Sequence, residues 1–268
     1  MRLNDLIRMD FSIMALLIFL IGCCLGSFLN VCIYRLPREG LSIFSPSRSF
    51  CPRCQAPIRY YDNIPLLSFL FLHGKCRSCR ARISWRYPLV EGLTGGMSVA
   101  LFLKFGLSFN FLSLWVLVAV LLAITFIDLD HQLIPDVISI PGIVLGFLLA
   151  VLGPSMPVKD SLIGIIAGGG SLYLVAFVYE TLAKREGMGG GDVKLLAMIG
   201  AWLGWKAIPF TLFASSLLGT AIGIGLMIAK REGRHYAIPF GPFLALSATA
   251  YIFFGPQLIG WYLGWGAR

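Results

Sequence analysis

Long apolar stretches recur along this chain, and they restrict its fold to a membrane architecture more than any other feature does. About 20 consecutive apolar residues in a helix cross the roughly 30 Å hydrocarbon core of a bilayer. Eight windows reach or approach that length, so we expect an all-α polytopic membrane protein with about eight transmembrane helices. The windows lie near residues 11–33, 92–109, 111–127, 134–153, 160–182, 192–206, 208–229 and 239–264.

The composition agrees with a lipid environment. Of the 268 residues, 57% are hydrophobic and 13% are charged, whereas soluble domains average roughly 25% charged residues. Seven and nine spans are the alternatives, because residues 106–110 barely separate two windows and window 192–206 is short. The first window is longer than the roughly 7–15 apolar residues of a cleavable signal, so we interpret it as a transmembrane helix.

Basic residues indicate which loops face the cytoplasm. Ten of the 22 lysines and arginines lie in one hydrophilic segment, residues 34–87. Positive charge marks cytoplasmic loops, so with eight spans this segment and loops 183–192 and 230–236 are predicted to face the cytoplasm. The net charge of +9 is then explained by topology and lipid headgroups, and no nucleic-acid partner is expected.

The hydrophilic segment divides the chain into three expected parts. Residues 1–33 form the first transmembrane helix, residues 34–87 a cytoplasmic four-cysteine module, and residues 88–268 a membrane-embedded bundle. We find no internal repeat in the sequence.

The module contains two CxxC pairs separated by 21 residues. Each CxxC turn can present two thiolates to one ion, and four thiolates in a tetrahedron suit zinc. About 50 residues with few large apolar side chains need such an ion to fold. A closed four-thiolate shell leaves no open position, so the metal is expected to be structural. The expected ligands are Cys51, Cys54, Cys76 and Cys79.

Other readings of the cysteines stay open. Disulfides are disfavoured in a reducing compartment, but a redox function or unliganded thiols would fit the same spacing. His73, between the pairs, is expected to be a surface residue. The three cysteines of the first window are expected to be small packing residues. They are Cys23, Cys24 and Cys32.

Two acidic clusters lie at the ends of expected spans, where ionisable residues are candidates for function. The first holds Asp128, Asp130 and Asp136, and the second is the stretch 187–194, which contains Asp192. The expected topology places both clusters at one membrane face. Three successive glycines before Asp192 permit close backbone approach, and a helix N-terminus favours a carboxylate there. A simple helix N-cap is the alternative.

Two apposed carboxylates suggest a particular chemistry. Like charges a few ångströms apart share a proton, so one acid can activate water while the other protonates a leaving amine. That is aspartyl proteolysis without a covalent intermediate. Spacing alone does not choose the partner of Asp192 among the three acids of the first cluster. A proton or cation pathway is an alternative use of such acids.

At these residues the chain resembles the type IV prepilin peptidase family, the bifunctional leader peptidases of type IV pilus and type II secretion systems. The resemblance covers nearly the whole chain, and its motifs are specific when taken together. They are Gly26–Val31 with Arg35–Pro37, the two CxxC pairs, Trp85–Glu91, the Asp128–Asp136 stretch, the GxGDxK motif Gly189–Lys194, and Pro239–Pro242.

The resemblance implies roles for individual residues. It assigns the two catalytic aspartates to Asp128 and Asp192, with Gly189, Gly191 and Lys194 supporting the catalytic loop. Lys194 would bias the protonation of Asp192 or anchor its helix at the headgroups. The resemblance further implies that the module binds structural zinc.

The resemblance also implies methylation of the new N-terminus with S-adenosylmethionine. The sequence shows no nucleotide-binding motif of the Rossmann type, so the methyl-donor site is not located. Glu91 and its neighbours are candidates, with a structural role as the alternative.

The expected function is cleavage of the short basic leader of prepilins and pseudopilins at the cytoplasmic face of a bacterial inner membrane. A carboxylate-based transporter and a non-catalytic assembly factor are the rival classes. Polar residues clustered at one face argue against the transporter. The sequence does not fix the oligomeric state.

Overall fold

The structure is a computed structural model. It describes residues 3–38, 40–45, 48–154, 156–184, 189–230 and 238–265, without the side chains of residues 3–10, 229, 230, 256, 259 and 261–265. Most of loop 230–236 and the motif residues Gly187 and Met188 lie outside the described residues.

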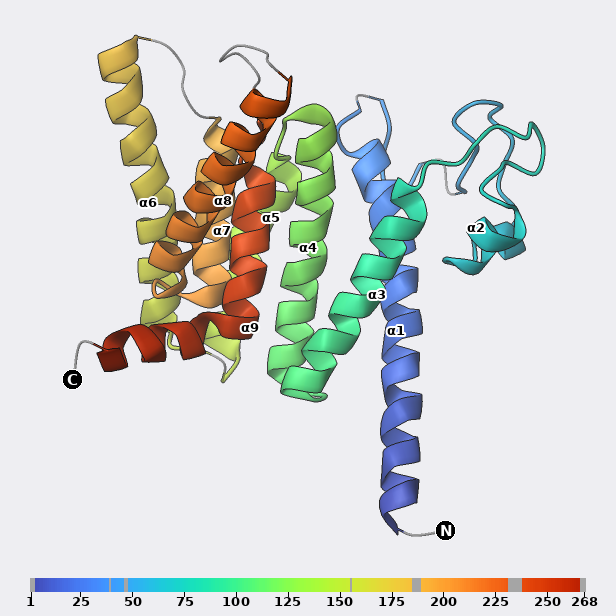
Figure 1. The fold of residues 1–268 in the computed structure, drawn as a ribbon, viewed down its shortest axis with the longest axis horizontal. Coiled ribbons are helices and arrows are strands. Elements are labelled where there is room, and N and C mark those ends of the chain that lie inside the picture. Colours follow the sequence, from blue (N-terminus) through green and yellow to red (C-terminus); the bar gives the residue numbers. More distant parts are fainter. Residues whose placement is uncertain are drawn as a thin grey trace. The chain divides into compact units, whose positions relative to one another are not determined.

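Helices account for all the regular structure in this described part (Figure 1). One helix lies over each of the eight apolar windows, and two short helical turns lie in the cysteine module, so the all-α prediction is confirmed. The elements are α1 (Leu3–Arg35), η1 (Tyr60–Asn63), α2 (Leu67–Phe71), α3 (Arg86–Phe105), α4 (Phe109–His131), α5 (Asp136–Leu152), α6 (Val158–Ala183), α7 (Gly190–Leu203), α8 (Ala207–Lys230) and α9 (Gly241–Trp265).

Among the described residues, four helices are long and apolar enough to cross a bilayer. They are Phe11–Arg35, Phe109–His131, Val158–Ala183 and Ala207–Ile228. Helix α5 and residues Gly241–Gly255 of α9 are apolar but shorter. A multi-pass membrane protein is thus established, while the count of eight spans stays a prediction.

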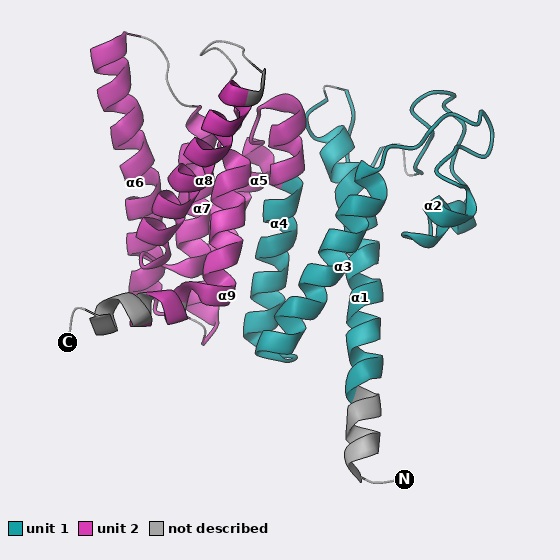
Figure 2. Cartoon of the chain, viewed as in Figure 1, with its two compact units in different colours: residues 1–123 teal, residues 124–268 magenta. Residues whose placement is uncertain are grey.

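The chain divides into two compact units, residues 1–123 and 124–268 (Figure 2). In unit 1, helices α1 and α3 pack so closely that glycines are required at their contact. A Cβ on Gly22 would lie 2.4 Å from the Ser98 hydroxyl, and one on Gly26 would lie 2.7 Å from the Cα of Glu91. Gly22 and Gly26 form a GxxxG spacing, which brings helix backbones together in membranes.

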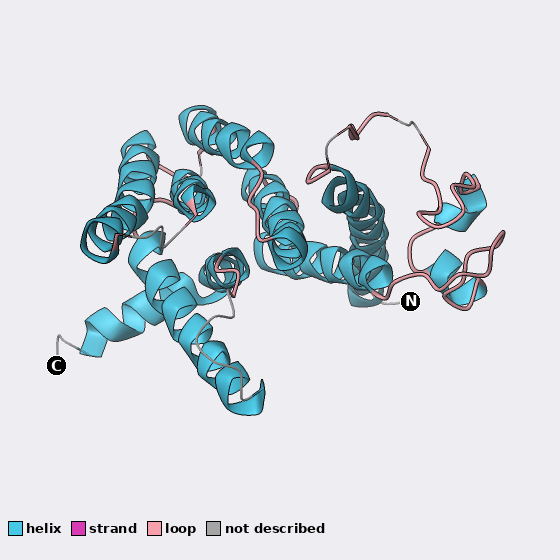
Figure 3. Ribbon diagram, turned by 90° about the horizontal axis from the view of Figure 1, so that it is seen from above, coloured by secondary structure: helices cyan, strands magenta, loops and turns pink. Residues whose placement is uncertain are grey.

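In unit 2, helix α7 packs against α5 on one side and α6 on the other (Figures 1 and 3). A Cβ on Gly164 of α6 would lie 2.3 Å from the carbonyl oxygen of Gly200, and one on Gly142 of α5 would lie 2.3 Å from the sulfur of Met198. Residues Leu195–Ala201 are all buried. With 14 residues, α7 is only about 21 Å long. Its buried middle packs against neighbouring helices, so its backbone does not need the length of a helix that faces lipid alone.

Candidate active site and metal centre

Asp128 lies in the last turn of α4 and is buried, with 5% of its surface exposed. Its Oδ2 atom accepts a hydrogen bond of 3.0 Å from the backbone N–H of Gly241, the first residue of α9. A Cβ at position 241 would lie 2.6 Å from that oxygen. Only glycine therefore allows the start of α9 to approach the carboxylate so closely.

Asp192 is the third residue of α7 and is half-buried. Its backbone N–H donates to the carbonyl oxygen of Gly189 at 3.2 Å, which closes the first turn of the helix. The expectation that Asp192 lies at a helix N-terminus is therefore confirmed. Its neighbour Gly191 packs against Ile134, which also packs against Gly241, the donor to Asp128, so unit 2 brings one acid from each cluster onto neighbouring segments.

Ile134 lies between the two segments that carry these acids. It belongs to the short loop between α4 and α5 and is buried, with 6% of its surface exposed. A Cβ on Gly191 would lie 2.9 Å from the Cβ of Ile134, and one on Gly241 would lie 3.2 Å from its Cδ1. One apolar side chain thus packs against both glycine contacts. The sequence reasoning gave neither residue a role of its own, because Ile134 was quoted only within the Asp128–Asp136 stretch and Gly241 only within the Pro239–Pro242 motif.

The other acids of the first cluster have different environments. Asp130 is exposed. Asp136 begins α5, and both of its carboxylate oxygens accept hydrogen bonds of 2.7 Å from Nζ of Lys194. Lys194 therefore links α7 to α5 through an ion pair whose two side chains are 39% and 56% exposed.

The glycines of the catalytic-loop motif differ in their surroundings. A Cβ on Gly189 would lie 4.0 Å from the backbone nitrogen of Gly191, and one on Gly190 would meet none of the described residues within 4 Å. Gly191, whose Cβ would touch Ile134, is the one of the three where packing excludes a side chain.

The two CxxC pairs of unit 1 form the same turn twice. In the first, the N–H of Cys51 donates to the carbonyl of Ala56 and the N–H of Gln55 donates to the carbonyl of Cys51. In the second, Cys76 and Arg80 make the equivalent bonds. Gln55 and Arg80 have φ angles of 58° and 57°, so each turn closes through a left-handed residue. This short repeat was not recognised in the sequence.

The four sulfur atoms fit one metal ion. The ligand atoms of Cys51, Cys54, Cys76 and Cys79 all lie within 4.8 Å of one another, and the sulfurs of Cys51 and Cys79 are 3.9 Å apart. Tetrahedral zinc with Zn–S bonds of about 2.3 Å places its sulfurs about 3.8 Å apart. The backbone N–H of Cys79 lowers the pKa of the Cys76 thiol, while the contacts of Cys54 with the other three sulfurs raise the pKa of its thiol.

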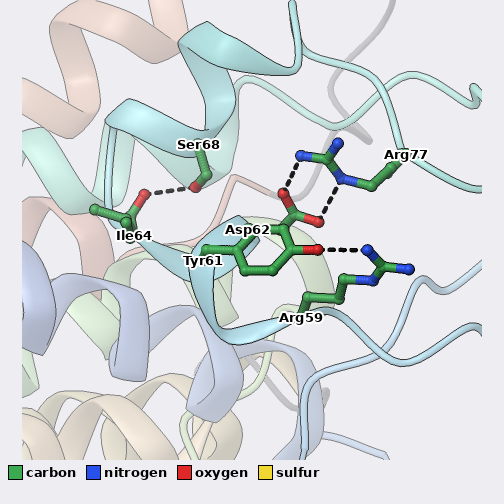
Figure 4. Close-up of polar contacts among 6 residues, drawn as sticks. All are labelled: Arg59, Tyr61, Asp62, Ile64, Ser68 and Arg77. Carbon is green, nitrogen blue, oxygen red and sulfur yellow. Dashed lines mark hydrogen bonds and ion pairs between the residues drawn. The ribbon is translucent and has the colours of Figure 1, made fainter.

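Polar contacts fasten the segment between the two cysteine turns (Figure 4). Arg77, inside the second CxxC, donates from Nε and from a terminal nitrogen to both oxygens of Asp62 in η1, at 2.8 and 2.6 Å. Arg59 donates to the hydroxyl of Tyr61. Hydrogen bonding from Arg77 holds the pKa of Asp62 below its usual value of 3.8. The module is therefore braced by an ion pair in addition to its cysteines.

Glu91 is buried in α3, with 8% of its surface exposed. Its Oε2 accepts a hydrogen bond of 2.8 Å from the backbone N–H of Leu66, a residue with a φ of +61°. Glu91 therefore joins the module to α3 and has a structural role there.

Each half of the chain matches the model of a known protein family. Residues 20–105 match the bacterial peptidase A24 N-terminal domain, and residues 115–224 match the type IV leader peptidase family. A prepilin leader peptidase/N-methyltransferase of Aeromonas salmonicida is 43% identical, over 92% of this chain and 93% of the relative. Proteins of the same name from Neisseria gonorrhoeae and Pseudomonas aeruginosa are 40% and 39% identical, over 91% of this chain in each case and 92% and 91% of the relative.

The chain belongs to the type IV leader peptidase family. Asp128 and Asp192 lie inside the segment that matches the peptidase model, and the four cysteines lie inside the segment that matches the N-terminal model. No solved structure matches the chain.

Proposed function

We propose that Asp128 and Asp192 are the catalytic pair with which this chain removes the leader from prepilins. Membership of the type IV leader peptidase family makes the chain a prepilin peptidase of the bacterial inner membrane, and the names of its relatives add N-methylation. The observation that carries the residue assignment is the position of Asp128. It is buried, it is fixed by the N-terminus of α9, and its segment neighbours that of Asp192.

The surroundings of the other acids support this choice. Asp136 is already neutralised by Lys194, and Asp130 is exposed. A carboxylate that activates water needs a lone pair directed at the water proton, together with a fixed geometry. Asp128 has a fixed geometry because its Oδ2 is held by the Gly241 amide, which leaves Oδ1 as a free acceptor position.

The mechanism follows from this division of roles. Asp128, already an acceptor, takes a proton from the attacking water, while Asp192 carries the shared proton and donates a hydrogen bond to the scissile carbonyl. Collapse of the tetrahedral intermediate breaks the C–N bond as one of the acids protonates the leaving amine. No covalent intermediate is formed.

The substrate of this reaction is a prepilin or pseudopilin with a short basic leader. Its apolar helix would lie in the bilayer beside unit 2, with the leader junction at the acid pair. We place the pair and the cysteine module on the cytoplasmic side, with eight membrane helices, because ten of the 22 basic residues lie in segment 34–87.

The four-cysteine cluster is proposed to hold one structural zinc ion. When bound, zinc cross-links the two turns and stabilises a module too small to fold by apolar burial alone. Cys51→Ser should lower the zinc content of the purified protein. Cys24→Ser, which changes an exposed cysteine of α1 outside the cluster, should leave it at the wild-type level. Equal zinc in both variants contradicts the four-thiolate site.

The catalytic assignment is tested by cleavage of a prepilin peptide with the purified full chain. Asp128→Asn and Asp192→Asn should each reduce kcat by about 10²- to 10⁴-fold, the usual contribution of a general acid or base. Asp130→Asn is the matched control, since it removes an exposed carboxylate from the same helix end. Wild-type cleavage by either of the first two variants, with the fold intact, rejects the pair.

A further inference from the structure

The single helical turn α2 in the cysteine module has two faces of different kinds. Ser68, Phe69 and Leu72 turn inward and line a cavity that the module forms with α1 and α3. The other face carries large apolar side chains at helical spacing, which places them on one side of the turn. They are Leu67, Leu70 and Phe71, and all three are exposed, up to 77% for Phe71.

Trp85, the residue before α3, extends this apolar surface. Its ring packs against that of Phe69 in α2, with 4.8 Å between the centroids, yet 75% of the residue is exposed. Neighbouring large apolar side chains at the surface of a protein mark a contact with a partner or a membrane. The four exposed residues are called the apolar patch here. They are Leu67, Leu70, Phe71 and Trp85.

The contacts of Leu66, the residue before α2, give the level of the apolar patch along the membrane helices. Its N–H donates to the carboxylate of Glu91 in α3 at 2.8 Å. Glu91 lies level with Gly26 of α1, because a Cβ on Gly26 would be 2.7 Å from the Cα of Glu91. The first candidate span ends at Arg35, which is about 13 Å further along α1 than Gly26.

This level lies inside the bilayer. The first candidate span has 25 residues, so it is about 37 Å long and exceeds the hydrocarbon core by about 7 Å. When the span is centred, each end extends beyond the core by only about 4 Å, and Gly26 lies deeper than that. Figures 1 and 3 show α2 to the side of α1 and α3, not beyond their ends. The apolar patch therefore lies at a depth where the surroundings are lipid.

The side of α3 next to α2 is also apolar and exposed. A Cβ on Gly92 would lie 3.9 Å from Cδ2 of Leu66, so Gly92 faces the start of α2. Leu89 and Leu93 lie one helical turn apart on either side of Gly92, and both are exposed. Glu91 faces the other way, towards α1. The apolar patch thus adjoins an exposed apolar side of α3.

The charge of the surrounding sequence is positive. Residues 64–90 contain five lysines and arginines and no acidic residue. Anionic lipids attract basic segments at the membrane surface, and tryptophan is enriched at the level of the headgroups. An apolar helical face with a tryptophan and basic neighbours is typical of elements that lie in the membrane interface.

We propose that α2 and Trp85 form an interfacial anchor that holds the cysteine module in the surface of the bilayer. Leu70 and Phe71 contact the acyl chains, Trp85 lies at the headgroups, and the basic residues that follow α2 meet anionic lipid. Interfacial helices bury their apolar face about 5–10 Å deep, which agrees with the level of Glu91. The module is then a membrane-surface element and not a domain surrounded by water.

A protein partner fits the apolar patch less well. Helix α2 has five residues and is about 7.5 Å long, so a membrane-spanning helix of about 20 residues would extend far beyond it. A stable contact between two proteins buries about 800 Å² on each partner, which is more than four partly exposed side chains supply. Acyl chains need no such matching surface.

Photo-crosslinking of the full chain to lipid tests the anchor. Phe71→p-benzoylphenylalanine and Phe44→p-benzoylphenylalanine are irradiated in nanodiscs that contain phosphatidylglycerol. Phe44 is the matched control, because it is an exposed aromatic residue between α1 and α3 that lies outside the apolar patch. Position 71 should attach to acyl chains, as identified by mass spectrometry, and this product should be lost at position 44. Zinc content verifies that each variant is folded.

The other outcomes overturn the proposal. They are equal lipid attachment at both positions, no lipid attachment at position 71, and attachment of position 71 to a second copy of the chain or to a pilin added to the nanodiscs. The last result assigns the apolar patch to a protein partner. Neither position belongs to the acid pair, and the readout does not depend on cleavage.

A second measurement tests Trp85 without photochemistry. Tryptophan fluorescence is compared for wild type and Trp85→Leu in nanodiscs whose lipids carry bromine near the headgroup end of the acyl chains. Bromine quenches only indole rings that it contacts, so the part of the fluorescence that is missing in Trp85→Leu should be quenched in wild type. If that part is as bright as in unbrominated lipid, Trp85 faces water and the anchor is rejected.

Discussion

A single methyl group at Gly191 would test how the loop before Asp192 is positioned. Position 191 faces Ile134, and a Cβ built there lies 2.9 Å from the Cβ of that residue, closer than real Cβ contacts come. Ile134 is buried and also contacts the start of α9. The first turn of α7 must therefore move to accept Gly191→Ala, and Asp192 is the next residue in that turn.

The expected size of the effect follows from the cost of overpacking. One extra methyl group in a packed interior costs about 1–3 kcal/mol. If this free energy is lost from the binding of the transition state by Asp128 and Asp192, kcat/KM drops by about fivefold to about 150-fold. Gly190→Ala supplies the control, because its Cβ would meet none of the described residues within 4 Å and its φ is not in the left-handed region. It should stay within about twofold of wild type.

The assay is cleavage of a prepilin peptide by the purified full chain, with thermal unfolding measured in parallel. Loss of activity in Gly191→Ala with little change in Tm locates the effect at the acid pair. If the two neighbouring alanines reduce kcat/KM equally, or if Gly191→Ala is as active as wild type, the contact with Ile134 does not position Asp192.

Two ion pairs give further predictions. Lys194→Met or Asp136→Asn should change kcat/KM by less than about fivefold, because exposed pairs contribute about 0.2–1 kcal/mol. A double-mutant cycle that gives a coupling above about 1 kcal/mol contradicts a purely structural link. Arg77→Lys should speed zinc loss to a chelator, because lysine cannot bind both oxygens of Asp62. Since the paired state lowers the pKa of Asp62 below 3.8, the stabilisation is complete above about pH 4 and is lost as pH falls through the lowered value. The Arg77→Lys effect should therefore be equal at pH 6 and pH 8.

Helix positions were predictable because the apolar windows are long and are interrupted by polar residues or glycine. The window at 192–206, for example, corresponds to α7 at Gly190–Leu203. Hydropathy could not reveal why this short helix is tolerated. The reason is a pair of close contacts, Gly164 with Gly200 and Gly142 with Met198, between segments far apart in sequence. Such contacts depend on which glycines face each other, and a hydropathy pattern does not encode that.

The metal cluster was predictable from cysteine spacing, because a CxxC turn is a local structure and its ligands are set within four residues. A cavity lined by α1, the cysteine module and the start of α3 was not predictable. Its lining includes Asn30 and Glu91, which are 61 positions apart, and Asn30 is one of several polar residues in α1. The partner of Asn30, the carbonyl of Tyr87, belongs to the backbone and therefore leaves no trace in the sequence.

The choice among the three acids of the first cluster depends on helical geometry. Residues two apart on a helix point about 200° away from each other. Asp128 and Asp130 therefore lie on opposite sides of α4, and only Asp128 is buried. The same offset separates Asp192 from Lys194 on α7. The helix can thus present a carboxylate to Asp128 while its lysine pairs with Asp136. Lys194 neutralises Asp136, the third acid of the first cluster. The mutual repulsion between carboxylates is therefore concentrated on Asp128 and Asp192, and such repulsion is the condition for two carboxylates to share a proton.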